Sequence, residues 1–197
     1  GSEMCIRDRF RGMTPNTLAI AAALGNVGVT ATLGFIGKDM VPSGSAQSPN
    51  PVAPAAEPII NTVDHIAAIG FGSVFAPNSF VTNFNININN NVQALGALGQ
   101  LGASRTSLGQ VQVTGSFQVY FRNRNILTDI VNDTPAPIMF VMEDANGAGL
   151  AIGIAKAKFT AAPKPTPGNN EQVLYNVNFQ GYQSGPGLSS LTIGKFS

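Results

Sequence analysis

The most restrictive feature of the chain is a strict alternation of apolar residues and asparagines near its centre. Residues 80–91 read FVTNFNININNN, so that Phe84, Ile86 and Ile88 are each followed by an asparagine. A period of two residues places the two kinds of side chain on opposite faces of a β-strand, whereas one face of a helix repeats every 3.6 residues. The alternation therefore predicts a strand with one packed face and one hydrated or hydrogen-bonded face.

Other stretches carry the same alternation, or apolar runs bounded by turn residues. Further strands are predicted over Asn26–Lys38, Val111–Phe121, Ile138–Met142, Leu150–Phe159, Val173–Phe179 and Leu188–Phe196. The segment Asp144–Gly147 ends in Asn-Gly, which is typical of a hairpin turn. Asn125–Val131 has helical spacing, with Asn123 or Asn125 as its N-cap and Pro135 beyond its end. The expected fold class is mainly β: an antiparallel β-sandwich or partly closed barrel of seven or eight strands with one short flanking α-helix.

Composition supports the same fold class. Only 11% of the residues are charged, against about 25% in an average soluble domain. Nineteen Asn, 22 Gly and 13 Pro favour turns and strands over helices. The net charge of +1 gives no electrostatic basis for binding nucleic acid or an acidic membrane surface. No apolar run reaches the roughly 18–20 residues needed to cross a bilayer.

The first nine residues resemble a translated sequencing adapter. Residues 1–9 read GSEMCIRDR, which is the translation of a common library-transposase adapter; the alternative is a natural polar tail. Cys5 is the single cysteine and lies in this stretch, so we expect no disulfide and no thiolate metal ligand. Residues 10–197 are expected to form one domain that lacks native residues at its N-terminal side.

Two segments do not suit regular pairing. Residues 41–58 contain five prolines, which predicts a long loop or arm. Loops longer than about 12–15 residues are uncommon in compact domains unless they are functional or disordered, so this arm is a candidate for partner contacts. Residues 96–109 are interpreted as a flexible Gly, Leu and Ser linker. The role of residues 59–77 is left open.

Candidate chemistry centres on the single histidine, His65. A metal site or a Ser-His-Asp arrangement would need Asp64, Asp129 or Asp133 beside it, and the spacing neither supports nor excludes this. A surface or hydrogen-bonded structural role for His65 is favoured.

The remaining polar motifs have structural interpretations. Glu143 and Asp144 directly precede the hairpin turn, where exposed acids are common. Gly96–Gly102 lacks the Lys-Ser or Lys-Thr of a phosphate-binding loop. Arg122 and Arg124 are interpreted as solvated charges at a strand end. We therefore predict no catalytic residue, no metal site and no cofactor.

The order of these segments resembles that of the tail tube (major tail) proteins of long-tailed bacteriophages, across residues 18–196. The segments that carry the resemblance are Leu33–Lys38, Phe80–Asn90, Val113–Phe121, Ile138–Gly147, Ile154–Phe159 and Val173–Phe179. The resemblance implies a non-enzymatic virion protein, assembled in the host cytoplasm, whose subunits form hexameric rings that stack around a channel for DNA.

The resemblance also implies the partners. These are further copies of the chain, other tail proteins, and DNA only in passage through the lumen, with no membrane. The residues assigned to an inter-ring arm are Pro42, Ser43, Pro49, Pro51, Pro54 and Pro58. The main alternative is another virion or extracellular β-module, such as a fibre, decoration or carbohydrate-binding domain. The lack of Trp and the presence of only three Tyr weaken a sugar-binding interpretation, and a hydrolase ranks third.

Overall fold

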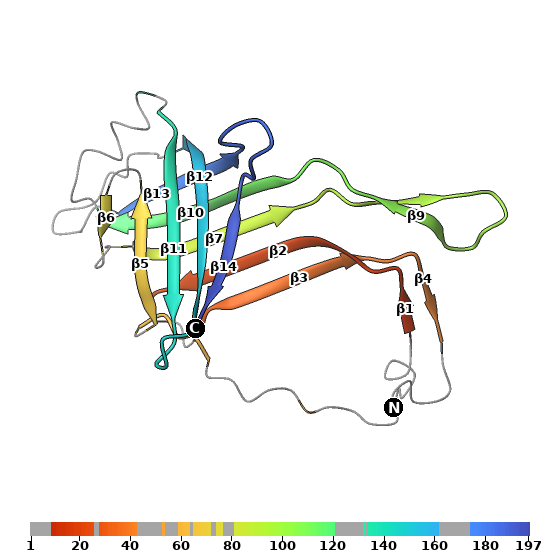
Figure 1. Cartoon of the computed structure of the whole chain (residues 1–197), viewed down its shortest axis with the longest axis horizontal. Helices are drawn as coiled ribbons and strands as arrows, with labels where there is room; N and C mark the ends of the chain where they lie inside the picture. Colours follow the sequence, from red (N-terminus) through yellow and green to blue (C-terminus); the bar gives the residue numbers. More distant parts are fainter. Residues whose placement is uncertain are drawn as a thin grey trace. The chain divides into compact units, whose positions relative to one another are not determined.

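The structure is a computed structural model, and it describes residues 9–25, 28–42, 53, 59–63, 65–71, 74–76, 81–120, 132, 134–161 and 174–197. Every regular element in these ranges is a β-strand (Figure 1). The strands are β1 (Arg9–Arg11), β2 (Thr14–Ala23), β3 (Thr30–Ile36), β4 (Asp39–Val41), β5 (Ile66–Phe71), β6 (Val74–Ala76), β7 (Val81–Asn89), β8 (Gln93–Gly96), β9 (Ala103–Ser107), β10 (Gln112–Tyr120), β11 (Ala136–Glu143), β12 (Gly149–Ala161), β13 (Leu174–Tyr182) and β14 (Thr192–Phe196).

Most strands belong to one ten-stranded sheet. Its order is β3-β2-β7-β10-β13-β12-β11-β5-β6, with β14 paired to β12, while β1-β4 and β8-β9 form separate two-stranded ribbons. β10 against β13, β12 against β13, β11 and β14, and β5 against β11 and β6 are all antiparallel pairs. A short hairpin joins β11 to β12, as is common for antiparallel neighbours. The pairs β10–β13 and β5–β11 instead bring together strands that are distant in sequence.

The chain divides into two compact units. Unit 1 comprises Gly1–Leu18, Thr32–Glu57 and Asn89–Val111; unit 2 comprises Ala19–Ala31, Pro58–Ile88 and Gln112–Ser197. Strands β2 and β3 therefore each contribute residues to both units.

The core of unit 2 lies on one face of the sheet. The alternation in β7 buries Phe84, Ile86 and Ile88, which are at most 9% exposed. The core is completed from the other strands by Val113 and Phe117 (β10), Ile138, Phe140 and Met142 (β11), Ile152, Ile154 and Phe159 (β12), and Tyr175, Val177 and Phe179 (β13). No polar or charged side chain is buried among the described residues.

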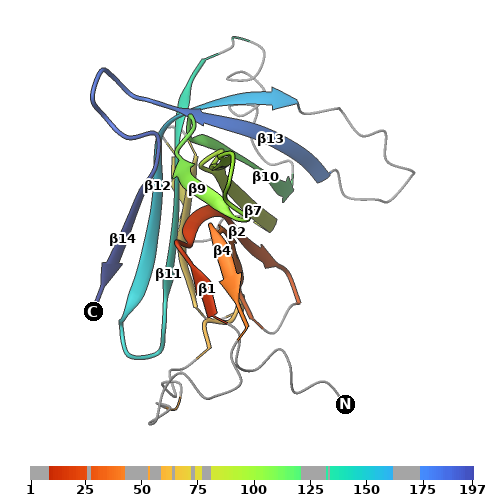
Figure 2. The same ribbon diagram turned by 90° about the vertical axis from the view of Figure 1, so that its right-hand side faces the viewer.

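The sheet of unit 2 is strongly curled. β11 and β12 cross the direction of β7 and β10 at a steep angle, as the two perpendicular views show (Figures 1 and 2). β12 connects the two parts: Gly149–Ala157 pairs with β11, and Lys156–Ala161 pairs with β13, which in turn pairs with β10. A register shift between Phe159 and Ala161 interrupts the ladder with β13, and such bulges bend and twist a strand. The result is a half-barrel with its apolar side chains inside.

Most predicted strands are confirmed. β7, β10, β11, β12 and β13 each fall on a predicted segment, and β3 and β14 occupy the middle and the end of theirs. The mainly β, antiparallel fold class is confirmed, and the curled sheet corresponds to the partly closed barrel. The predicted helix over Asn125–Val131 lies outside the described residues, as does most of the arm over 41–58.

Several strands were not predicted. The linker expected over residues 96–109 is wrong: β9 pairs with β8 in a hairpin, and Gly99 adopts a φ of 81° within the turn. β9 contains no apolar alternation, so period-two patterning could not reveal it. β5 and β6 lie in the segment 59–77 that was left open, and β2 was also missed.

Candidate assembly and channel surfaces

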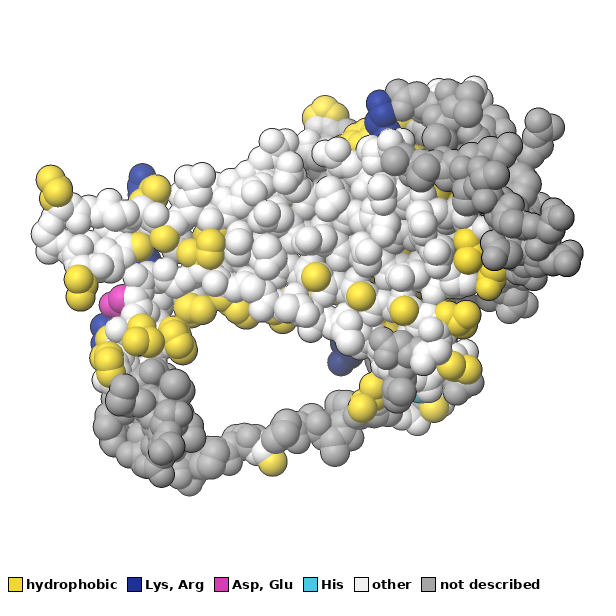
Figure 3. All heavy atoms as spheres, turned by 180° about the vertical axis from the view of Figure 1, so that it is seen from behind, with side chains coloured by type: hydrophobic (Ala, Val, Ile, Leu, Met, Phe, Trp, Pro, Cys, Tyr) yellow, Lys and Arg dark blue, Asp and Glu magenta, His cyan; other side chains and the backbone are white. Residues whose placement is uncertain are grey.

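The outward face of β7, β10 and β13 carries uncharged polar side chains, and we call it the amide face. Its residues are Asn83, Asn85 and Asn87 on β7, Thr114, Ser116 and Gln118 on β10, and Asn176, Asn178 and Gln180 on β13. Register places Thr114 opposite Gln180 and Ser116 opposite Asn178. The centre of the space-filling view is mostly white, the colour of the backbone and of side chains that are neither hydrophobic nor charged (Figure 3).

Side chains of the amide face are partly fixed by cross-strand hydrogen bonds. Asn85 Nδ2 donates to Ser116 Oγ over 2.9 Å, and the Ser116 backbone N–H donates to Asn85 Oδ1 over 3.2 Å. Gly115 of β10 has no room for a side chain, because a Cβ would meet the Asn85 carbonyl oxygen of β7 and the Phe179 ring of β13. Lys156 and Lys158 are exposed on neighbouring β12, and Lys158 lies opposite Gln180 in the register.

Unit 1 buries almost no apolar surface. Of the twenty buried hydrophobic residues among those described, Val92 is the one that belongs to unit 1. Nine of the fifteen large hydrophobic residues found exposed belong to unit 1: Phe10, Met13, Leu33, Phe35, Met40, Leu98, Leu101, Leu108 and Val111. We call these nine the exposed apolar set. Clustered exposed apolar side chains mark interaction sites more often than isolated ones do.

Hydrogen bonds, rather than a core, connect the strands of unit 1. Asn16 is central: its Oδ1 accepts from the Val92 backbone N–H over 2.8 Å, and its carbonyl oxygen accepts from the Asn90 N–H over 2.8 Å. Asn90 Nδ2 in turn donates to the Pro15 carbonyl oxygen over 3.1 Å. Each such bond contributes a net stability of only about 0.5–1.5 kcal/mol.

On β3, two exposed apolar side chains share one face. A Cβ at Gly34 would meet the Thr17 hydroxyl, so these two residues face the same side, and Leu33 and Phe35 face the other. Leu33 is 57% and Phe35 48% exposed. The alternation that predicted a packed face for this strand is thus present, but the single chain does not cover it.

β3 and β14 are also strands with an unpaired edge. Within the described part of the chain, β3 pairs with β2 alone and β14 with β12 alone. An unpaired edge presents a row of backbone N–H and C=O groups to which another strand can pair.

His65 has a structural hydrogen bond. Its Nδ1 accepts from the Asn61 backbone N–H over 3.0 Å, and its carbonyl oxygen accepts from the Glu143 N–H over 2.9 Å. Asp64, Asp129 and Asp133 lie outside the described residues. Among the residues that the structure does describe, no three His, Cys, Asp or Glu side chains are arranged to hold a metal ion.

The hairpin turn after β11 is confirmed. Asp144 Oδ1 accepts from the backbone N–H groups of Asn146 (2.8 Å) and Ala148 (2.9 Å), and Gly147 has a φ of 83°. The carboxylate therefore orders the turn. Arg122 and Arg124 lie outside the described residues. Among the residues that are described, there is no helix of the length and apolar character needed to cross a membrane.

The described part of the chain is a mainly β, antiparallel structure with a curled sheet. The family model of the phage tail tube protein matches residues 5–181. The chain therefore belongs to the phage tail tube protein family, and it is a structural component of the phage tail that assembles with other tail subunits. Among curated proteins, no match to the chain is found.

Proposed function

We propose that the chain is a tail tube subunit whose copies form hexameric rings, and that these rings stack into the tube through which DNA passes. The proposal rests on the family membership and on one contrast in burial. Unit 2 has a buried apolar core, whereas unit 1 leaves its apolar set exposed. Neighbouring copies would cover that set. Assembly in the host cytoplasm and the absence of catalysis belong to the same proposal.

Ring formation is supported by unpaired strand edges, of which β3 and β14 are two. β3 and β14 are different strands, so pairing between copies through them is heterologous rather than self-complementary. Heterologous contacts close into rings or extend as filaments, depending on the rotation between copies. A tube of stacked rings needs contacts that close each ring and contacts that extend the stack.

We assign the amide face to the channel lining. Amide and hydroxyl groups hydrate well, and they carry no charge that would hold the phosphates of a passing duplex. On β7, β10 and β13 the nine residues of this face are uncharged, and the two exposed lysines of β12 border it. Asn85→Lys together with Asn178→Lys should therefore slow DNA release from assembled virions and make it sensitive to salt. Unchanged release would contradict the lining assignment.

The arm over 41–58 is proposed as an inter-ring contact, with Pro42, Ser43, Pro49, Pro51, Pro54 and Pro58 as its residues. Its support is the proline content of the sequence, because proline lacks the backbone N–H that a central strand of a sheet uses for pairing. Deletion of residues 43–56 should leave a folded chain that forms single rings without stacking. Loss of the folded state would contradict this assignment.

Electron microscopy of the purified chain tests the central proposal. Rings of six or stacked tubes are expected at high protein concentration. A chain that stays monomeric over the whole accessible concentration range would overturn the proposal. The alternative of a fibre, decoration or carbohydrate-binding module has no observation in its favour once the family is known.

A further inference from the structure

The Asn146-Gly147 pair in the turn between β11 and β12 is chemically reactive. It is the single Asn-Gly dipeptide in the sequence. The side-chain amide carbon of an asparagine can be attacked by the backbone nitrogen of the next residue, and glycine, which has no Cβ, hinders this attack least. Asn146 is exposed and lies in a turn rather than in a strand. Sequence and exposure therefore both favour the reaction at Asn146.

The turn holds the attacking nitrogen in a hydrogen bond. The Gly147 N–H donates to the Asp144 carbonyl oxygen over 3.1 Å, and the Asp144 N–H donates to the Ala148 carbonyl oxygen over 2.7 Å. The Asp144 carboxylate accepts from the N–H groups of Asn146 and Ala148. The Gly147 nitrogen must lose its proton to react, so its hydrogen bond must open first. Local opening of this kind is most frequent where backbone hydrogen bonds are exposed to solvent.

We infer that Asn146 is a site of spontaneous deamidation in the folded chain, and that the turn ordered by Asp144 sets its rate. The Gly147 nitrogen gives up its proton and bonds to Cγ of Asn146, while the side-chain amino group takes up a proton and leaves as ammonia. Water then opens the resulting succinimide ring at one of its two carbonyl groups. The product at position 146 is aspartate or isoaspartate. The reaction occurs within one chain and is independent of the proposed assembly.

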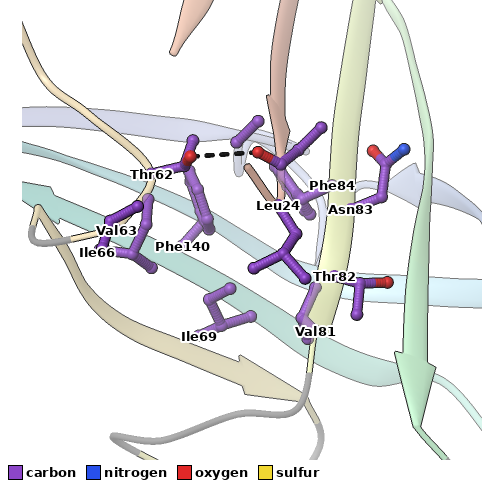
Figure 4. Close-up of a pocket in the computed structure, with 12 residues that line it drawn as sticks. Leu24, Thr62, Val63, Ile66, Ile69, Val81, Thr82, Asn83, Phe84 and Phe140 are labelled. Atoms are coloured by element: carbon purple, nitrogen blue, oxygen red, sulfur yellow. Dashed lines mark hydrogen bonds between the residues drawn. The ribbon is translucent and has the colours of Figure 1, made fainter. Parts of the chain in front are cut away.

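Exposed asparagines in the strands should react far more slowly. Asn83 is also exposed, but it is followed by Phe84 and belongs to β7, which pairs with β2 and β10. Figure 4 shows Asn83 and Phe84 on opposite sides of this strand. The Cβ of Phe84 hinders attack by its backbone nitrogen, and pairing on both edges of β7 restrains the backbone. Asn83 is therefore an internal control within the same chain.

Deamidation changes the length and the charge of the turn. Isoaspartate routes the main chain through the former side chain, which adds one backbone atom between Asp144 and Ala148 and should disrupt their hydrogen bond. Aspartate keeps the backbone length but adds a carboxylate to a turn that already holds Asp144. Glu143 Oε1 also lies beside the turn, 3.6 Å from the position that a Cβ on Gly147 would take. Like charges at such distances repel, so both products should weaken the hairpin.

Peptide mapping by mass spectrometry tests the inference on the full chain. During incubation in mildly alkaline buffer at physiological temperature, Asn146 should progressively gain the mass of one NH replaced by one O, and Asn83 should not. Fragmentation should identify isoaspartate as the main product, and the unfolding midpoint should fall as it accumulates. Asn146→Gln, whose longer side chain cyclises much more slowly, should keep both its mass and its midpoint. An intact Asn146 in the folded chain, under conditions that deamidate the urea-unfolded chain, would overturn the inference.

Two variants isolate the role of Asp144. Asp144→Ala removes the acceptor for the Asn146 and Ala148 N–H groups, so it should deamidate several-fold faster. Asp144→Ser also removes the charge but keeps an oxygen acceptor, and it should react at nearly the original rate. Equal rates in these two variants, with folding checked by circular dichroism, would refute control by the turn. A folded original chain that deamidates as fast as the urea-unfolded chain would refute it independently of any variant.

Discussion

The rings of Phe84 and Phe140 stack with their centroids 4.4 Å apart and their planes 15° apart. Their strands, β7 and β11, are four positions apart in the sheet order. In a flat sheet with about 4.8 Å between strands, four positions correspond to roughly 19 Å. The two rings can meet only because the sheet of unit 2 curls. Their contact is therefore direct evidence of the half-barrel.

Truncation of either ring should strongly destabilise the fold. Phe84→Ala and Phe140→Ala should each lower the free energy of unfolding by about 3–5 kcal/mol. A double-mutant cycle should give a coupling energy of about 0.5–1.5 kcal/mol, as expected for stacked rings. Urea denaturation measures both quantities. Asn87→Ala, on the outward face of the same strand, should change stability by less than about 0.5 kcal/mol, and purely additive Phe effects would contradict the stacking.

Gly115 is expected to reject any side chain. A Cβ there would meet backbone at Asn85 and the ring of Phe179, so Gly115→Ala should cost about 1–3 kcal/mol from overpacking. Gly153, in the middle of β12, has open space where its Cβ would lie. Gly153→Ala should therefore stay within about 1 kcal/mol of the original chain. Equal unfolding midpoints for the two variants would contradict the close approach.

Asp144 should stabilise the β11–β12 turn through its acceptor oxygen. Asp144→Ala removes the partner of the Asn146 and Ala148 N–H groups and should cost about 1 kcal/mol. Asp144→Asn keeps a carbonyl acceptor and should retain most of the stability. Thermal unfolding of the two variants compares them, and an alanine variant as stable as the asparagine variant would show that the side chain is dispensable.

Asn16 should control local opening in unit 1. Asn16→Ala frees the Val92 N–H, which should then exchange with solvent deuterium faster. Asn16→Asp retains the acceptor and should preserve most of the protection. Residue-resolved hydrogen exchange is the measurement, and unchanged protection of Val92 in the alanine variant would argue against this role.

The exposed apolar side chains of β3 should matter for association and not for folding. Leu33→Ser with Phe35→Ser should leave the unfolding midpoint of the chain nearly unchanged, since both are about half exposed, yet should reduce oligomer formation in sedimentation velocity. Leu188→Ser serves as the matched control and should leave oligomers intact. A large loss of folding stability would instead assign these two residues to the core of the subunit.

Period-two patterning predicted the strands whose alternation is strict. β7, β10 and β13 place apolar and polar residues in turn, and the Asn-Gly pair identified the hairpin at Asp144. β5 reads IAAIGF and β9 reads ASRTS, and neither alternates. Both take strand conformation from partners distant in sequence, such as β11 for β5. The pattern of apolar and polar residues within a short segment cannot predict pairing with a distant strand.

Burial was less predictable than strand position. Leu33 and Phe35 alternate as a packed face should, yet they remain exposed in the single chain. The curl that joins Phe84 to Phe140 depends on contacts between distant segments and on the bulge in β12, which periodicity cannot reveal. The division into a unit with a core and a unit without one was likewise invisible to sequence patterns.

The scarcity of buried residues in unit 1 has a consequence for how such a sequence can change over time. In an assembled tube, Leu33 or Leu98 would be interior residues of the particle although they are surface residues of the isolated chain. The effect of a substitution at these positions would depend on the contact with the neighbouring copy, which carries the same substitution. Contacting positions of unit 1 would thus coevolve, and a change in a projecting side chain would have to be compensated by a second substitution in the same gene.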